Sequence, residues 1–174
     1  MEIKLNLGCG NKKIDGFLGV DKFFCNGADI IADVNLLPFK ESTISEILLD
    51  NVVEHIIDIP GLMKELYRVL KNNGILIVKT PHFTSFASWK DPTHFHHLSY
   101  FSFDYFNKDS TMHYIGVRFQ IVEKKLSFGG LWSLIGKLIF SISPKIYEKY
   151  FCFIFKAGNL TFILKTIKEE VSEF

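Results

Sequence analysis

The first 80 residues contain five short runs of apolar residues, and a polar residue or a glycine follows each run. Runs that are short and continuously apolar are typical of parallel strands covered on both faces of a sheet. Before the last run, apolar residues recur at helical spacing between Asp58, which can cap a helix, and Asn72-Asn73-Gly74, which can end one. The predicted strands are residues 3–7, 17–20, 29–32, 46–49 and 74–78.

The second half of the chain has a different pattern. Residues 81–106 are rich in aromatic side chains and histidine and have weak periodicity, which indicates a loop with a short helix. Residues 118–126 alternate like a strand, and residues 160–167 form a last strand before a charged tail. We therefore expect an α/β fold: a Rossmann-like, doubly wound, mostly parallel sheet with an antiparallel edge hairpin.

Residues 128–155 are strongly apolar, which raises the question of a membrane span. A span needs ~20 unbroken apolar residues. Here Lys137, Pro144 and Glu148 are among the residues that interrupt the run, so we expect no transmembrane span. Two alternatives stay open: packed or dimer-forming helices, in a monomer or a homodimer, and a surface for peripheral membrane contact.

Composition narrows the classes of function. Apolar residues make up 48% of the 174 residues, enough for the core of one domain. Lysine and arginine number 20 and aspartate and glutamate 19, which gives no electrostatic reason to expect nucleic acid as a partner. The three cysteines lack C-x-x-C spacing, so neither a disulfide framework nor a zinc knuckle is indicated. The start of the chain does not resemble a signal peptide, so a cytoplasmic location is expected.

The first predicted strand ends at a glycine turn, Gly8-Cys9-Gly10. A dinucleotide-binding turn has the pattern G-x-G-x-x-G/A, but Lys13 occupies the third small position. The same lysine excludes a Walker loop, G-x-x-x-x-G-K-[ST]. No basic cluster is placed to neutralise a pyrophosphate. The turn therefore favours an adenosine without phosphates, and an NAD-dependent oxidoreductase is disfavoured.

Polar residues end the next three strands, at Asp21, Asp33 and Asn51. In an open parallel sheet, ligands bind outside the carboxyl ends of the strands. Asp21 can accept hydrogen bonds from two ribose hydroxyls, and Asp33 can accept one from an adenine amino group. Only residues 11–16 separate the turn from the second strand, too few for the usual crossover helix at ~1.5 Å per residue. We predict a turn in place of that helix.

The set of motifs resembles the class I, Rossmann-like S-adenosylmethionine-dependent methyltransferases. The resemblance rests on LNLGCGNKKIDGFLGVD, ADVNLLPFKESTISEILLDNVVEHI, ELYRVLKNNGILIVKTP and DPTHFHHLSYFSFDYF, with YEKYFCFIFKAGNLTFILKTIK near the end. It is strongest to small bacterial methyltransferase-domain proteins often associated with sugar and surface-polysaccharide biosynthesis. It implies one domain, 1–174, with a cofactor-binding half (1–80), an acceptor-side loop and helical segment (81–157) and a final strand (158–168).

The resemblance implies S-adenosyl-L-methionine as cofactor and assigns residues to it. Glu54 and His55 are expected to start a helix as structural residues. The residues expected to bind the cofactor are Gly8, Cys9 and Gly10 on the methionine and ribose side, Asp21 on the ribose, Asp33 and Val34 on the adenine, and Asn51 near the sulfonium.

The segment from Asp91 to His97 contains three histidines, His94, His96 and His97. It follows the fifth strand, so it can fold over the crevice as a catalytic or substrate-binding lid. Structural hydrogen bonding, a metal site and pH sensing are the alternatives. The spacing does not match a helical metal motif, so we expect no metal ion. For a hydroxyl acceptor, the candidate general base is His94 with Asp91 as its orienting carboxylate, and His82 is the alternative.

These observations predict an S-adenosylmethionine-dependent methyltransferase. The expected acceptor is a hydroxyl of a small or lipid-linked sugar-type molecule. The alternative is a catalytically inactive cofactor- or partner-binding module with the same fold, because fold does not determine function.

Overall fold

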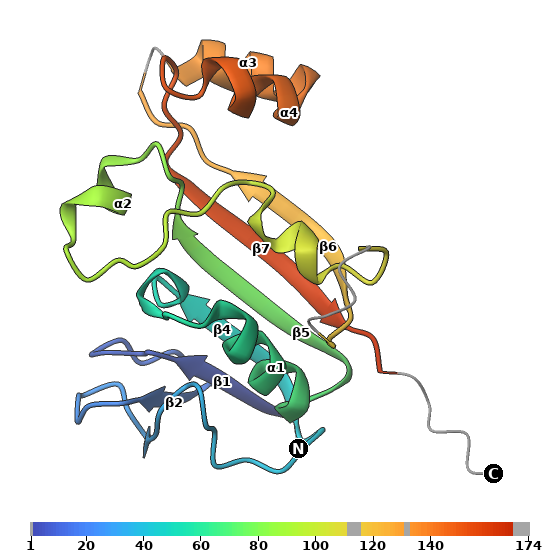
Figure 1. Cartoon of the computed structure of the whole chain (residues 1–174). Helices are drawn as coiled ribbons and strands as arrows, with labels where there is room; N and C mark the ends of the chain where they lie inside the picture. Colours follow the sequence, from blue (N-terminus) through green and yellow to red (C-terminus); the bar gives the residue numbers. More distant parts are fainter. Residues whose placement is uncertain (1, 111–115, 131–132, 169–174) are drawn as a thin grey trace.

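The computed structural model describes residues 2–110, 116–130 and 133–168 (Figure 1). Leu131 and Trp132 of the apolar segment, and the charged tail from residue 169 onward, lie outside the described residues. A seven-stranded sheet has the order β3-β2-β1-β4-β5-β7-β6, and β7 is antiparallel to both of its neighbours. The strands are β1 (Ile3–Leu7), β2 (Leu18–Asp21), β3 (Ile30–Ile31), β4 (Ile44–Asp50), β5 (Leu70–Pro81), β6 (Phe119–Leu126) and β7 (Asn159–Thr166).

Short helical elements connect the strands. They are η1 (Val53–His55), α1 (Ile59–Val69), α2 (Phe86–Lys90), η2 (Ser102–Phe106), α3 (Ser133–Ile142), α4 (Pro144–Ile146) and the π-helical turn η4 (Tyr147–Phe151). Within the described ranges, no helix has both the length and the apolar character that crossing a membrane requires. The predicted α/β fold with an antiparallel strand near one edge is confirmed.

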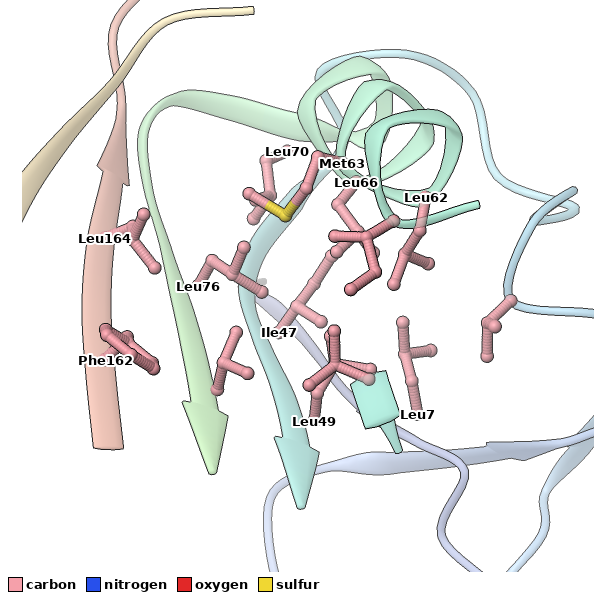
Figure 2. Packing of buried hydrophobic residues seen from close by; sticks show 14 of the residues in the cluster. Leu7, Ile47, Leu49, Leu62, Met63, Leu66, Leu70, Leu76, Phe162 and Leu164 are labelled. Carbon is pink, nitrogen blue, oxygen red and sulfur yellow. The ribbon is translucent and has the colours of Figure 1, made fainter. Parts of the chain in front are cut away.

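Helix α1 forms where the sequence predicts it and lies over β4 and β5 (Figure 1). The Asp58 side chain caps it by accepting a hydrogen bond from Gly61 N at 2.9 Å. Leu62, Met63 and Leu66 are fully buried against the sheet (Figure 2). Each such side chain contributes about 1.5–3 kcal/mol of transfer free energy.

The predicted end of this helix is wrong. It stops at Val69 because Leu70 has extended backbone angles and begins β5, where it pairs with Ile44. The left-handed residue, Asn73 with φ +62°, therefore lies within β5 and not after the helix.

Coverage of the sheet also differs from the prediction. Residues 47–49 of β4 are all buried, as expected of a strand covered on both faces. In β7, however, Phe162 and Leu164 are buried whereas Ile163 and Lys165 are partly exposed, and β5 alternates in the same way. The expectation that the first five strands are covered on both faces is therefore wrong for β5, whereas β7 was expected only as part of the antiparallel edge hairpin.

The shortened first crossover is confirmed. Residues 8–17 contain turns and no helix, yet β1 and β2 pair in parallel with Leu5 opposite Leu18. The buried Asn6 side chain donates to Lys12 O at 3.2 Å, and Lys12 N donates to Cys9 O at 2.9 Å. These bonds hold the compact connection that replaces the helix.

Candidate functional site

The glycine turn after β1 requires its glycines for different reasons. Gly8 and Gly10 have φ of +63° and +52°, in the left-handed region that favours glycine. A Cβ on Gly8 would also lie 2.5 Å from Val52 Cγ2, whereas one on Gly10 would meet nothing within 4 Å. Gly8 is therefore fixed by packing against the end of β4, and Gly10 faces open space.

Asp21 closes this turn from the end of β2. Its Oδ2 accepts a hydrogen bond from Gly10 N at 2.8 Å, and its Oδ1 accepts one from Phe23 N at 3.0 Å. A carboxylate has about four acceptor sites, so both oxygens can still accept from ligand hydroxyls. Burial raises the pKa of the neighbouring Cys9 thiol to about 11, so this thiol is neutral at pH 7.

A cavity of about 790 Å³ lies at the carboxyl ends of β1, β2 and β4. This volume lies in the range of small-molecule sites. Five of the predicted cofactor residues line it: Gly8, Asp21, Asp33, Val34 and Asn51. Cys9 and Gly10 are not among its lining residues. Sequence reasoning did not predict the remaining lining residues, which are Lys22, Phe23, Asn35, Val52, His55, Ile56, Ile57, Asp58 and Gly61.

Asp33 is held in an ionised, accepting form. Its Oδ1 accepts from the backbone N of Asn35 at 2.9 Å and from that side chain, and its Oδ2 lies 3.1 Å from Lys22 Nζ. The backbone hydrogen bond from Asn35, followed by contact with Lys22, lowers the pKa of Asp33 below its usual value. With Asp21, it gives the cavity two carboxylates for an adenosine, and the residues present fit the cofactor that the sequence implies.

The histidine segment is folded against η1. His94 Nδ1 lies 2.9 Å from Ser88 O, and its Nε2 lies 4.0 Å from Asp91 Oδ2. Asp91 mainly caps its own loop, because its Oδ1 accepts from Thr93 N at 2.9 Å and from Thr93 Oγ1 at 2.7 Å. These bonds from Thr93 lower the pKa of Asp91. The structure brings the two predicted catalytic residues together, but Ser88 O fixes the ring of His94 more closely than Asp91 does.

The other histidines have structural partners. His96 Nε2 lies 3.0 Å from Ile57 O, and His97 stacks on Trp89 with ring centroids 3.6 Å apart. His82, the alternative base, is fully buried, with Nε2 3.1 Å from Glu148 Oε1. It does not line the cofactor cavity.

Glu54 is the residue whose surroundings the sequence did not predict. It is 1% exposed, and neither carboxylate oxygen has a hydrogen-bond partner among the described residues. Burial raises the pKa of its carboxyl group. Its backbone oxygen accepts from Phe95 N at 2.9 Å and His96 N at 3.2 Å, which fixes the histidine segment beside η1. The sequence signal was a Glu-His pair directly after β4, interpreted as a helix start.

A second cavity, of about 680 Å³, adjoins the first at Asn51. Nine of its ten lining residues have polar or charged side chains, and three of them are lysines from three different elements: Lys79 on β5, Lys125 on β6 and Lys137 on α3. Thr80, whose buried hydroxyl has no partner among the described residues, lines it as well.

Comparisons with known proteins agree with this geometry. Residues 20–78 match the family model described as "Methyltransferase domain". No curated protein matches the chain. Several solved structures share its fold at low identity. A methyltransferase from Archaeoglobus fulgidus, titled as S-adenosylmethionine-dependent, is 18% identical with a TM-score of 0.64, over 95% of this chain and 86% of that one.

Two further structures extend the comparison. A putative S-adenosylmethionine-dependent methyltransferase from Listeria monocytogenes is 16% identical with a TM-score of 0.53, over 96% of this chain and 92% of that one. A putative Haloferax volcanii methyltransferase, solved with the activator Trm112, is 12% identical with a TM-score of 0.60, over 96% and 83%. The strand order is typical of the class I, Rossmann-like methyltransferase fold, and the domain matched over residues 20–78 indicates an S-adenosylmethionine-dependent methyltransferase.

Proposed function

We propose that this enzyme methylates a hydroxyl group of a small, sugar-type acceptor carried on a lipid, in the cytoplasm and as part of polysaccharide biosynthesis. The observation that carries the proposal is the polar second cavity, which meets the cofactor cavity at Asn51. Hydroxyl and amide side chains suit a polyhydroxyl ligand, and three lysines suit the phosphate that links a sugar to a lipid.

The first cavity supplies the cofactor contacts in this proposal. Asp21 accepts from the ribose hydroxyls, Asp33 accepts from the adenine amino group, and Val34 packs against the ring. In the same proposal Gly8 is on the methionine and ribose side, with Cys9 and Gly10 in the turn that extends beyond the cavity lining, and Asn51 is near the sulfur. S-adenosylmethionine, when bound, supplies a methyl group already activated by a positively charged sulfur.

The chain must then position a hydroxyl and accept its proton. His94 is the candidate base, because Ser88 O accepts from its Nδ1 and leaves the Nε2 lone pair available. Asp91, 4.0 Å from Nε2, stabilises the imidazolium that forms. The histidine segment also shields the reacting groups from water, since it is hydrogen-bonded to η1 through Glu54 O.

The lipid part of the proposal rests on α3, α4 and η4. Figure 1 shows α3 and α4 beyond the end of the sheet at which β5 finishes. Leu138 and Ile142 of α3 are 63% and 77% exposed, and Phe153, shortly after η4, is 74% exposed. Lys137, Lys145 and Lys149 lie on the same elements, and lysines beside apolar side chains favour an anionic membrane surface.

A transfer assay tests the proposal. Purified protein is incubated with methyl-labelled cofactor and a bacterial extract, and the extract is partitioned into lipid and aqueous fractions. The proposal expects base-stable label in the lipid fraction, as a methyl ether gives, and loss of it in His94→Ala. Cofactor binding without label in any fraction would support the inactive module instead. Label only in protein or nucleic acid would contradict the proposal.

A further inference from the structure

Three side chains of types that bind metal ions lie close together, and one of the three, His55, lines the cofactor cavity. They are Glu54 and His55 of η1 and His94 of the histidine segment, and their potential ligand atoms all lie within 4.8 Å of one another. The two histidine rings meet edge to face, with centroids 4.5 Å apart. Proximity alone does not make a site, so the protonation of each group decides what the cluster can bind.

The hydrogen bonds of His94 fix its tautomer. Its Nδ1 lies 2.9 Å from Ser88 O. A backbone carbonyl only accepts hydrogen bonds, so Nδ1 carries a proton, and in the neutral ring Nε2 then presents a lone pair. A ring nitrogen bonded to a backbone carbonyl is the usual support of a metal-binding histidine, because it orients the opposite nitrogen.

His55 is fixed in the same way through Thr93. Its Nδ1 lies 3.3 Å from Thr93 O and 3.0 Å from Thr93 Oγ1. That hydroxyl already donates its hydrogen to Asp91 Oδ1 at 2.7 Å, so it can only accept from His55. Nδ1 of His55 is therefore also protonated, and its Nε2 also presents a lone pair.

Glu54 supplies the second, independent observation. Its side chain is buried, and neither oxygen has a hydrogen-bond partner within the described ranges. A carboxylate buried without a partner loses its hydration without compensation, which is costly unless a cation or a donor completes the site. The Thr80 hydroxyl is close enough to lower the pKa of Glu54 but makes no hydrogen bond to it, and in their neutral forms the two histidines have no second N–H to donate. A cation bound by all three groups satisfies every one of them.

We propose that Glu54, His55 and His94 bind one divalent transition-metal ion, with Zn²⁺ as the preferred ion. Two imidazole nitrogens and one carboxylate form a ligand set that suits zinc, manganese or iron, whereas Mg²⁺ and Ca²⁺ favour all-oxygen sets. Three protein ligands leave a coordination position open, as in catalytic zinc sites. This inference departs from the sequence prediction of no metal, because the sequence did not place Glu54 beside His94.

The other cluster of this kind in the described residues is Cys9, Asp21 and Cys25. Both oxygens of Asp21 already accept backbone hydrogen bonds, from Gly10 and from Phe23. It therefore lacks the unpartnered buried group that distinguishes Glu54.

The role of the metal rests on the proposed function. Glu54, His55 and His94 would hold the ion, whose charge would lower the pKa of an acceptor hydroxyl at the open position, so that the hydroxyl proton could pass to water. The acceptor oxygen then bonds to the methyl carbon as the sulfur–carbon bond breaks and its electron pair returns to sulfur. The products are a methyl ether, S-adenosylhomocysteine and one proton. In this form Nε2 of His94 is a ligand and does not act as the base.

Metal analysis of the full-length protein tests the site without an acceptor. Protein stripped with chelator is titrated with Zn²⁺ by calorimetry, and bound metal is counted after gel filtration. We expect one Zn²⁺ per chain, with a higher melting temperature. Glu54→Gln, His55→Ala and His94→Ala each weaken binding by about 100-fold, since losing even a supporting partner typically costs 10–100-fold.

His96→Ala is the matched control, because His96 is in the same loop but its Nε2 is bonded to Ile57 O. It should retain Zn²⁺ binding, and it should retain S-adenosylhomocysteine binding together with Glu54→Gln and His94→Ala, which also shows that these three fold. His55 lines the cofactor cavity, so the fold of His55→Ala is checked by circular dichroism. Failure of the wild type to bind Zn²⁺, or equal loss in His96→Ala, overturns the metal site and leaves the proposed function intact. Failure to bind S-adenosylhomocysteine refutes the proposed function separately.

Discussion

The two parts of the site are built in different ways. The cofactor cavity is formed by the ends of strands: Gly8, Asp21 and Asn51 each lie where a run of apolar residues stops. The cluster of Glu54, His55 and His94 forms where the loop after β5, which carries His94, hydrogen-bonds to the backbone of η1, which carries the other two residues. Strand ends follow from local sequence pattern, whereas the loop contact depends on residues about 40 positions apart. A single sequence can therefore reveal functional residues at strand ends, but not those that a distant loop brings together.

The largest expected effect separates the two parts. Asp21→Ala removes the carboxylate that accepts from Gly10 N and is proposed to accept from the ribose. It should weaken S-adenosylhomocysteine binding by roughly 1–3 kcal/mol, because it leaves hydroxyls unpaired. Zn²⁺ binding at Glu54 should not change. Calorimetry with each ligand measures both, and equal losses of both would show that the two parts are not independent.

Gly8→Ala should act on stability as well as on the cofactor cavity. The added Cβ would lie 2.5 Å from Val52 Cγ2, on a backbone with φ of +63°. We expect a loss of about 1–3 kcal/mol in the free energy of unfolding. Urea unfolding measures it. Adding Val52→Ala should recover the part due to the clash, and Gly10→Ala, which meets only the backbone strain, should cost less.

The apolar helical segment should affect membrane binding and leave the cofactor cavity unchanged. Leu138→Glu with Ile142→Glu places charge on two of the most exposed apolar positions. Binding to vesicles with anionic lipid should fall about tenfold for each of the two positions, since each buried apolar side chain contributes about 1.5 kcal/mol or more. Vesicle flotation measures it. Unchanged flotation would remove the support for a lipid-linked acceptor, and S-adenosylhomocysteine binding serves as the control.

The smallest expected effect is a change in the pKa of one carboxylate in each part of the site, Asp33 and Asp91. The pKa of Asp33 is lowered first by the backbone N–H of Asn35, and that of Asp91 first by the side chain of Thr93. Thr93→Val should therefore raise the pKa of Asp91 clearly, whereas Asn35→Ala should raise that of Asp33 less, because the backbone donor stays. Carboxyl titration by NMR measures both. Equal shifts would contradict the assignment of causes.

These lowered values also set the direction of the pH dependence. The folded pKa of each group lies below the unfolded value of about 3.9, so its contribution to stability is present above that pH. The contribution is lost as the pH falls through the folded pKa. The side chains of Asp33 and Asp91 are 40% and 41% exposed, so solvent screening keeps the effect small.

The extent of prediction from sequence follows the same division. Strand positions, the shortened crossover and the lining residues Gly8, Asp21, Asp33, Val34 and Asn51 were predictable, because each depends on the pattern of its own segment. The end of α1 was not predictable, because the pairing of Leu70 with Ile44 ends the helix before the turn signal Asn72-Asn73-Gly74 is reached.

The surroundings of the Glu54 side chain could not be predicted from the sequence either. A Glu-His pair after a strand is ambiguous until the loop containing His94 is placed beside it. Likewise, the sequence could not show that Ser88 O and Thr93 set the tautomers of the two histidines.

The central claim is that the strand ends form a site for S-adenosylmethionine, and titration with S-adenosylhomocysteine tests it most directly. We predict saturable binding of one ligand per chain in calorimetry, with NADH giving no comparable heat. The absence of binding by the wild-type protein at high micromolar S-adenosylhomocysteine, or tight binding of NADH in its place, would contradict the account.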